Sequence, residues 1–211
     1  MKFGNTELVD SLLHDGLIDS FDHRHMTETA EALAIDYGIS RQEQDAFANL
    51  SQQRFEAAKR KGVFDAELTP VGSVIEDQHP RPETTLEGLA HLAPVFSGGT
   101  VTAGNASGLN DGAAMLVVAD RGTAERNGWP VLAVLDQWVS VGCDPKKMGL
   151  GPVHAIRRLT AGGLRIADCQ TLEINEAFAA QTVACQRELG VSPSQLNPHG
   201  GAIAVGHPCL L

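Results

Sequence analysis

The stretch that decides the fold runs from residue 169 to residue 190 and reads CQTLEINEAFAAQTVACQRELG. Its first part is typical of a strand, and from Ala177 to Gly190 it has the pattern of a helix. The turn from a strand into a helix is the usual place for functional groups in α/β folds. Asn175, at this turn, can orient a water or bind a carbonyl. The alternative is an Asx-type helix cap with Glu176 in the first helical turn, where that carboxylate would be costly to bury without a partner.

A glycine-rich turn follows at residues 197–208, NPHGGAIAVGHP. Gly200 and Gly201 allow the backbone to turn sharply or to approach a ligand closely. Gly206 and Pro208 flank His207, so we expect its imidazole to be held in one orientation. A positioned histidine can act as a general base or donate to a developing oxyanion. A structural histidine in a turn is the alternative that this motif leaves open.

A third segment, GTVTAGNASGLNDGAA at residues 99–114, is rich in small residues. It matches neither the dinucleotide-binding glycine pattern nor a P-loop. Its small residues would let a ligand approach the backbone, with the Ser107 hydroxyl as a hydrogen-bond partner. Close packing of a helix on a strand is the alternative.

The first hundred residues read mostly as helices and irregular segments. Thr27 is a candidate N-cap for a helix that Gly38 ends, and Ser40 with Glu43 has the spacing of a capping box. The helix that this box opens should pack through an apolar side made of Ala46, Phe47, Leu50, Ala57 and Ala58. Residues 63–71 read as a short extended piece, and residues 85–92 as a short helix.

After residue 100 the predicted elements alternate. Residues 113–119 form an apolar run, and residues 131–142 are strand-like. A short helix follows at residues 151–163, with a proline near its start and glycines at its end. Strands that alternate with helices indicate an α/β layer with a mainly parallel sheet.

Composition counts against several classes of function. The 211 residues carry a net charge of −10, which counts against a nucleic-acid partner. No apolar run approaches the roughly 20 residues of a membrane span, and the N-terminus has no secretory h-region, so we predict a cytoplasmic protein. The four cysteines form no CxxC pair, so we expect reduced thiols and no metal site.

Five segments together are more specific than any one of them: RQEQDAFANLSQQR, GTVTAGNASGLNDGAA, MGLGPVHAIRR, NEAFAAQ and GGAIAVGHP. In this order and spacing the chain closely resembles the thiolase family, which includes acetyl-CoA acetyltransferases and 3-ketoacyl-CoA thiolases. The resemblance implies an α/β fold with a layered αβαβα core, truncated here, and a mainly helical loop domain. Residues 1–106 would form the loop domain, residues 107–130 the end of the N-terminal half, and residues 131–211 part of the C-terminal half.

The resemblance also implies an acyltransferase that joins or splits a carbon–carbon bond between acyl groups on coenzyme A. His207 would activate a cysteine nucleophile and help to stabilise the thioester oxyanion, and Asn175 would hold a water in the oxyanion hole. Acyl-CoA and CoA would be the ligands, with no separate cofactor. The expected assembly is a homo-oligomer, a tetramer in the family, or a complex with another thiolase subunit.

Six further residues are implied in CoA or acyl binding. His25, Met26 and Ser107 would line the CoA channel, and Arg81 would lie near the nucleotide end, where a guanidinium can meet phosphate. Met148 and Phe178 would border the acyl pocket.

The cysteines depart from the family pattern. The family's nucleophilic cysteine lies upstream of the part that this sequence matches, and its second catalytic cysteine lies downstream. Cys143, Cys169, Cys185 and Cys209 sit in neither motif, and Cys209 is too close to His207 in the chain to replace the nucleophile. We therefore expect an internal part of a thiolase that is inactive alone. The alternative is a non-catalytic truncated thiolase that binds CoA or a thiolase subunit.

Overall fold

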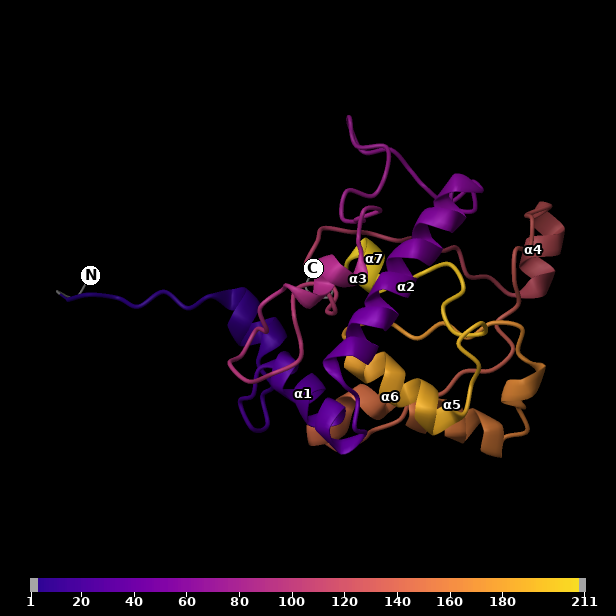
Figure 1. Cartoon of the computed structure of the whole chain (residues 1–211). Coiled ribbons are helices and arrows are strands. Elements are labelled where there is room, and N and C mark those ends of the chain that lie inside the picture. The colour runs from indigo at the N-terminus through magenta and orange to yellow at the C-terminus, as the bar shows by residue number, and fades with distance from the viewer. Residues whose placement is uncertain (1–3, 209–211) are drawn as a thin grey trace.

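A computed structural model of the chain describes residues 4–208, so Cys209 lies outside the described residues. Most of its helical elements are gathered into one body, from which the N-terminal segment extends, while the short helix at residues 121–127 stands apart (Figure 1). None of the described helices is both long enough and apolar enough to cross a membrane. In chain order the elements are η1 (Leu12–Leu17), α1 (Met26–Asp36), α2 (Arg41–Arg60), α3 (Leu86–Ala90), α4 (Arg121–Asn127), η2 (Pro145–Leu150), α5 (Gly151–Ala161), η3 (Ile166–Asp168), α6 (Ala179–Leu189) and α7 (Ala202–Val205).

Helix α6 lies at the centre of the body and packs against α1, α2 and α5. Its first seven residues, Ala179 to Cys185, are all buried, so the helix has no solvent-facing side there. A helix that is buried all round needs small or apolar residues, and the sequence AAQTVAC supplies them. The main core cluster forms around this helix from Leu33, Ala34, Ile39, Leu150, Val153, Leu172, Ile174, Ala180, Val183, Ala184, Cys185, Val191 and Leu196.

Helix α1 begins two residues earlier than its sequence predicts. His25, and not Thr27, is the N-cap: its Nδ1 accepts a hydrogen bond from the Thr27 backbone N–H at 3.1 Å. The Glu28 carboxylate accepts the His25 N–H in return, at 2.9 Å. The prediction that Thr27 caps the helix is therefore wrong, because an imidazole nitrogen already satisfies the Thr27 amide. Gly38 follows the helix in a left-handed conformation, as predicted.

The capping box of α2 is confirmed. The Ser40 hydroxyl accepts the Glu43 N–H at 3.2 Å, and the Glu43 carboxylate accepts the Ser40 N–H at 2.9 Å. The predicted apolar side is only partly correct, because Ala46 is exposed. The face that α2 buries consists of Gln44, Asp45, Ala48, Ser51, Gln52, Phe55 and Ala58.

Two shorter elements correct the sequence prediction. The helix expected at residues 85–92 is α3, and it covers only Leu86–Ala90, with the Thr85 hydroxyl as its cap. The piece expected to be extended at residues 63–71 begins as a turn, in which Leu68 N–H donates to the Phe64 carbonyl at 3.1 Å. The helix predicted at residues 151–163 is confirmed as α5.

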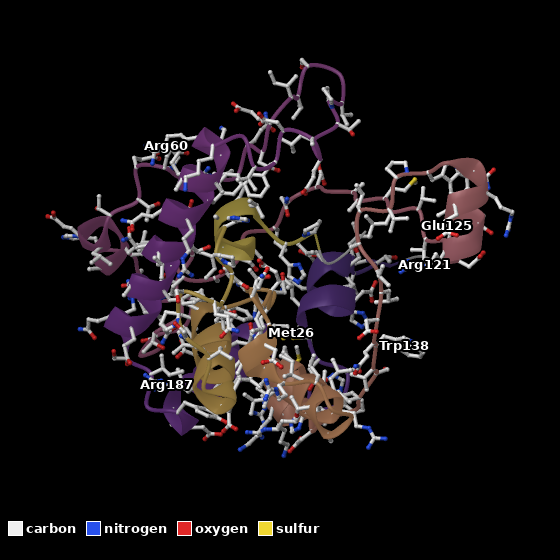
Figure 2. The ribbon with its side chains drawn as sticks, turned by 90° about the vertical axis from the view of Figure 1, so that its right-hand side faces the viewer. Met26, Arg60, Arg121, Glu125, Trp138 and Arg187 are labelled. Atoms are coloured by element: carbon white, nitrogen blue, oxygen red, sulfur yellow. The ribbon has the colours of Figure 1, made fainter. Side chains whose placement is uncertain are left out.

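The parallel sheet is not confirmed. Within residues 4–208 strand pairing is limited to isolated bridges, of which Leu172 with Leu196 is parallel. The segments 113–119 and 131–142 run without regular structure, and their apolar side chains face outward, with Leu116 86% and Leu132 94% exposed. Figure 2 shows the Trp138 side chain pointing away from the helices. A strand needs a neighbour for its backbone hydrogen bonds, and these two segments have none among the described residues.

The capping box yields a stability prediction. Replacing Ser40 by alanine leaves the Glu43 N–H without its acceptor, so Ser40→Ala should lower the free energy of unfolding by about 1 kcal/mol. Urea unfolding followed by circular dichroism measures this change. Ser97→Ala, at an exposed turn, is the matched control; an equal loss in both variants would contradict the role of the cap.

Candidate active site

The three segments singled out in the sequence meet in the structure. Ser107 donates two hydrogen bonds to the Ala177 carbonyl, one from its N–H at 3.0 Å and one from its hydroxyl at 3.1 Å. Ala106 forms an antiparallel bridge with Phe178. The His207 backbone N–H donates to the Gly108 carbonyl at 2.8 Å. Segment 106–108 therefore lies between the start of α6 and the turn that carries His207.

A buried carboxylate joins these segments to α2. Glu176 is 1% exposed. Its Oε2 accepts the Ser51 hydroxyl at 2.6 Å and the Ile203 N–H at 3.2 Å, and its Oε1 accepts the Asn197 amide at 2.9 Å. A Cβ added to Gly201 would lie 2.5 Å from the Glu176 carboxyl carbon. The turn at residue 201 can approach the carboxylate only because glycine has no side chain.

Burial and hydrogen bonding act on Glu176 in opposite directions. Removal from water raises the pKa of the Glu176 carboxyl, while the bonds from Asn197 and Ser51 lower it; burial is the larger effect. Three donors around one buried carboxylate form a site that is satisfied by the protein itself. Glu176 therefore has a structural role, and we call this carboxylate with its donors Ser51, Asn197 and the Ile203 N–H the Glu176 hub. The preceding side chain, Asn175, is exposed to solvent.

Asn175 and His207 have polar side chains that nothing in residues 4–208 engages. Asn175 is exposed and His207 is half-buried. The hydrogen bonds of the described residues include none from either side chain, although the backbone around both is fixed by the contacts above. A rigid backbone that carries an unengaged amide and an unengaged imidazole is what acid–base and oxyanion chemistry requires.

Helix α7, which precedes His207, is held from two sides. On one side the Gln52 amide donates to the Ile203 carbonyl at 3.2 Å. On the other side the His79 Nδ1 donates to the Ala204 carbonyl at 2.9 Å. The short helix is therefore fixed to α2 and to the loop at residues 78–82. These two contacts together set the direction in which the chain enters His207.

The structure brings Ser107 and Phe178 to the same place as Asn175 and His207, but the other predicted CoA-binding residues lie on different elements. His25 caps α1 and packs edge-on against Phe96, with ring centroids 5.8 Å apart. Met26 is the first residue of α1. Met148 lies on η2 and is 43% exposed.

Arg81 is exposed, and its guanidinium donates to carbonyls of its own loop, including that of His79 at 2.6 Å. Its backbone N–H donates to the Gln52 Oε1 at 2.9 Å. Gln52 thus links the Arg81 loop to α7, and the guanidinium would have to leave its carbonyl partners to meet a phosphate.

The sequence reading missed the residues that build the hub, namely Ser51, Gln52 and Asn197. A signal existed for Ser51, because it lies four residues from both Phe47 and Phe55 and so interrupts an apolar row on α2 with a hydroxyl. No such signal marks Asn197, whose amide also donates to the Ile174 carbonyl at 2.8 Å.

The described cysteines make their contacts with residues other than His207. Cys185 is fully buried in α6 and its thiol donates to the Gly149 carbonyl at 3.2 Å. Burial raises the pKa of the Cys185 thiol to about 11, which leaves it protonated at neutral pH. The Cys169 thiol faces the Arg165 carbonyl, and Cys143 lies beside Gly151. Residues 4–208 also contain no group of three or more His, Cys, Asp or Glu side chains that could hold a metal ion.

The hub can be tested by removing one donor. Ser51→Ala takes away the shortest bond to Glu176 and also the acceptor of the Gly201 N–H at 3.1 Å. It should lower the free energy of unfolding by about 1–3 kcal/mol, since buried polar atoms are left without partners. Urea unfolding measures the loss, and Ser73→Ala in an exposed turn is the control. A loss no larger than that of the control would show that the hub contributes little.

The raised pKa of Glu176 predicts a pH dependence. Because the native pKa is above the ordinary 4.5, the native state holds the proton more tightly than the unfolded chain. The stability from this group is complete below the unfolded pKa and is lost as pH rises through the native pKa. Glu176→Gln cannot titrate. The unfolding free energy of the wild type minus that of Glu176→Gln should therefore fall as pH rises above the ordinary carboxyl pKa of 4.5. A difference that rises with pH would mean that the three donors outweigh burial.

The chain matches two family profiles, "Thiolase, N-terminal domain" over residues 1–122 and "Thiolase, C-terminal domain" over residues 129–210. It is 48% identical to an acetyl-CoA acetyltransferase of Pseudomonas aeruginosa, over 99% of this chain and 56% of that protein. The human mitochondrial 3-ketoacyl-CoA thiolase superimposes with a TM-score of 0.94 at 43% identity, over 99% of this chain and 55% of that one. The same human enzyme in complex with CoA gives a TM-score of 0.93 at 44% identity, over 99% of this chain and 54% of that one.

The chain thus spans a little over half the length of the relatives that it matches. Over that length its path follows theirs, so its fold is the thiolase fold. The profile matches cover almost every residue, and the relatives align from end to end of this chain. The chain therefore belongs to the thiolase family.

Proposed function

We propose that this chain supplies part of the active site of a thiolase-type acyltransferase, an acetyl-CoA C-acetyltransferase that forms or cleaves 3-ketoacyl-CoA. The observation that carries the proposal is the meeting of segment 106–108, the start of α6 and the His207 turn around the Glu176 hub. That meeting leaves two polar side chains, Asn175 and His207, unengaged on a fixed backbone.

In this proposal His207 and Asn175 have complementary roles in the reaction of a thioester. A cysteine thiol, supplied from outside the described residues, is the nucleophile, and the His207 imidazole takes its proton. The thiolate attacks the thioester carbonyl carbon, and negative charge develops on the carbonyl oxygen. The bond from this carbon to the CoA sulfur then breaks, and the departing CoA thiolate takes the proton held by the His207 imidazolium. A water that donates to the carbonyl oxygen while it is held by the Asn175 amide would stabilise the negative charge, together with the imidazolium N–H.

CoA binding belongs to the same proposal. Ser107 and Phe178 support it by their position beside Asn175, and the 44% identical human thiolase that is known with CoA bound supports it by analogy. His25, Met26, Arg81 and Met148 are proposed to contact CoA or the acyl chain. CoA thioesters would be the substrates, without a further cofactor.

The domain division stays a prediction, with a loop domain at residues 1–106, the end of one half at residues 107–130 and part of the other half at residues 131–211. Assembly into a homo-oligomer or with a thiolase subunit, and a cytoplasmic location, are also predictions.

One observation favours a second candidate function, a thiolase chain that binds CoA or a thiolase subunit without turnover. The described cysteines contact Gly149, Gly151 and Arg165, and the Cys185 thiol titrates only near 11. None of these thiols is placed to be the nucleophile that His207 would activate.

A thiolysis assay and a CoA-binding measurement on the 211-residue chain test whether the chain binds CoA and whether it turns over substrate by itself. Loss of acetoacetyl-CoA after addition of free CoA is followed with the purified chain, and CoA binding is measured by calorimetry on the same sample. We expect CoA binding and no turnover, because the described thiols are not at the site. Turnover that Asn175→Ala and His207→Ala both reduce, by about 10²-fold or more for His207, would show that the chain contains its own nucleophile.

The exposed His14 gives the control variant. His14→Ala should leave CoA binding unchanged. Turnover equal in wild type and in His207→Ala would come from a contaminating enzyme. Absence of both CoA binding and turnover would overturn the proposed function for the chain alone.

A further inference from the structure

One histidine that the candidate site does not use, His79, packs beside the turn that carries His207. Its Nδ1 lies 2.9 Å from the Ala204 carbonyl oxygen, three residues before His207. The His207 N–H donates to the Gly108 carbonyl at 2.8 Å, and a Cβ added to Gly108 would lie 1.8 Å from the His79 Nε2. The imidazole of His79 therefore fills the space beside Gly108, and it contacts the groups that fix both ends of the stretch from residue 204 to residue 207.

The bonding partner of the His79 ring determines which nitrogen carries the proton. A carbonyl oxygen only accepts hydrogen bonds, so the His79 Nδ1 must carry a proton in order to bond to Ala204. In the neutral ring the Nε2 then holds the lone pair, and this is the ring atom nearest to the open side of Gly108. The contact with Ala204 therefore requires the Nδ1–H tautomer of His79.

His79 is itself held on a constrained loop. It is half-buried, and the proline that follows it restricts its backbone to extended conformations. Its carbonyl accepts the Arg81 guanidinium at 2.6 Å, and the Arg81 N–H donates to the Gln52 Oε1 at 2.9 Å. The amide of the same Gln52 donates to the Ile203 carbonyl at 3.2 Å. Gln52 and His79 thus bond to two consecutive carbonyls of α7, and Arg81 links the two side chains to each other.

We propose that His79 is a positioning residue for His207: its Nδ1–H fixes the Ala204 carbonyl, and its ring keeps Gly108 in place as the acceptor of the His207 N–H. A general base must be held within hydrogen-bond reach of the proton that it takes. With both ends of this stretch fixed by one side chain, the His207 ring leaves the backbone in one direction. The use of His207 as a base rests on the proposed function, whereas the positioning of its backbone does not.

Three substitutions separate the hydrogen bond of His79 from the bulk of its ring. His79→Ala removes both. His79→Phe keeps a ring beside Gly108 and loses the donor. His79→Asn loses the ring but keeps an N–H donor close to the place of the imidazole Nδ1, from which it can still bond to the Ala204 carbonyl. If the hydrogen bond positions the turn, the asparagine variant should behave like the wild type and the phenylalanine variant should not.

The readout is hydrogen exchange of the His207 amide in the full chain, followed by NMR without CoA or substrate. His79→Ala and His79→Phe should each speed this exchange by about two- to tenfold, the effect of one hydrogen bond. His79→Asn should restore the wild-type rate. The buried Thr182 amide, which donates to the Phe178 carbonyl at 3.0 Å, is the internal reference. A loss of global stability would speed both amides alike.

A second readout is the tautomer of His79 in the wild type. Nitrogen-15 chemical shifts of labelled histidines show which ring nitrogen is protonated, and the signals missing in His79→Phe assign the residue. At about pH 8.5, above the ordinary histidine pKa of about 6.5, we expect the Nδ1–H form. The Nε2–H form would overturn the proposal, because that ring cannot donate to Ala204.

Gly108→Ala tests the contact between the ring and Gly108 without a change at His79. The added methyl group would overlap the His79 ring, so this variant should displace the ring from Ala204 and speed the His207 exchange. In the double variant with His79→Ala the overlap is absent, and the two effects should therefore not add. Additive effects would overturn the contact that the proposal needs.

His91→Ala is the matched control, because the His91 Nδ1 also donates to a backbone carbonyl, that of Glu87, at 2.7 Å. His91 is exposed on the far end of α3, and its removal should leave the His207 exchange unchanged. A thermal melt shows which variants are folded. If His79→Ala does not fold, His79→Phe replaces it, since its ring fills the same space.

An unchanged His207 exchange in a folded variant that lacks the donor would overturn the proposal. So would an equal change at Thr182, or a failure of His79→Asn to restore the wild-type rate. Exchange and tautomer are both read without turnover or CoA. A failure here is therefore distinguishable from a failure of the proposed function, which the thiolysis assay and calorimetry test separately.

Discussion

The structure depends on one buried carboxylate. Glu176 contacts α2 through Ser51, the start of the glycine-rich turn through Asn197, and α7 through the Ile203 N–H. The turn around Asn197 is irregular and α7 has only four residues, so both depend on contacts with the rest of the chain. A buried acid without partners would cost several kcal/mol. With three donors it instead fixes the distances between parts of the chain that lie far apart in sequence.

The hub explains why the candidate site is both rigid and open. Ser51, Asn197 and the Ile203 N–H all donate to Glu176 and not to its neighbour. The Asn175 amide therefore remains available to an external ligand. On the other side of the turn, the His207 backbone is fixed by Gly108 while its ring is free of partners in the described residues. Rigid backbone with unengaged side chains lowers the cost of placing a substrate, because little freedom is lost on binding.

Local chemistry could be predicted from the sequence where it depends on near neighbours. The capping box of Ser40 and Glu43, the proline at the start of α5 and the helix α6 all follow from residues within a few positions of one another. The cap of α1 was predicted wrongly, because a histidine is not a usual cap and its ring nitrogen competed successfully with the Thr27 hydroxyl. The motifs with Asn175 and His207 were also visible, since Asn175 stands where a strand-like stretch turns into a helix and His207 stands in a glycine-rich turn.

Sequence by itself determined the family, the main helices and the two candidate catalytic side chains. Only the tertiary structure decided which groups hold them: Ser51 and Glu176 are 125 positions apart, and so are His79 and Ala204. The same limit applies to the apolar segment at residues 131–142, whose pattern predicts a strand but which has no strand partner in the described residues. Side-chain patterns report local preference, whereas hydrogen-bond partners and strand pairing depend on which distant segments the fold brings together.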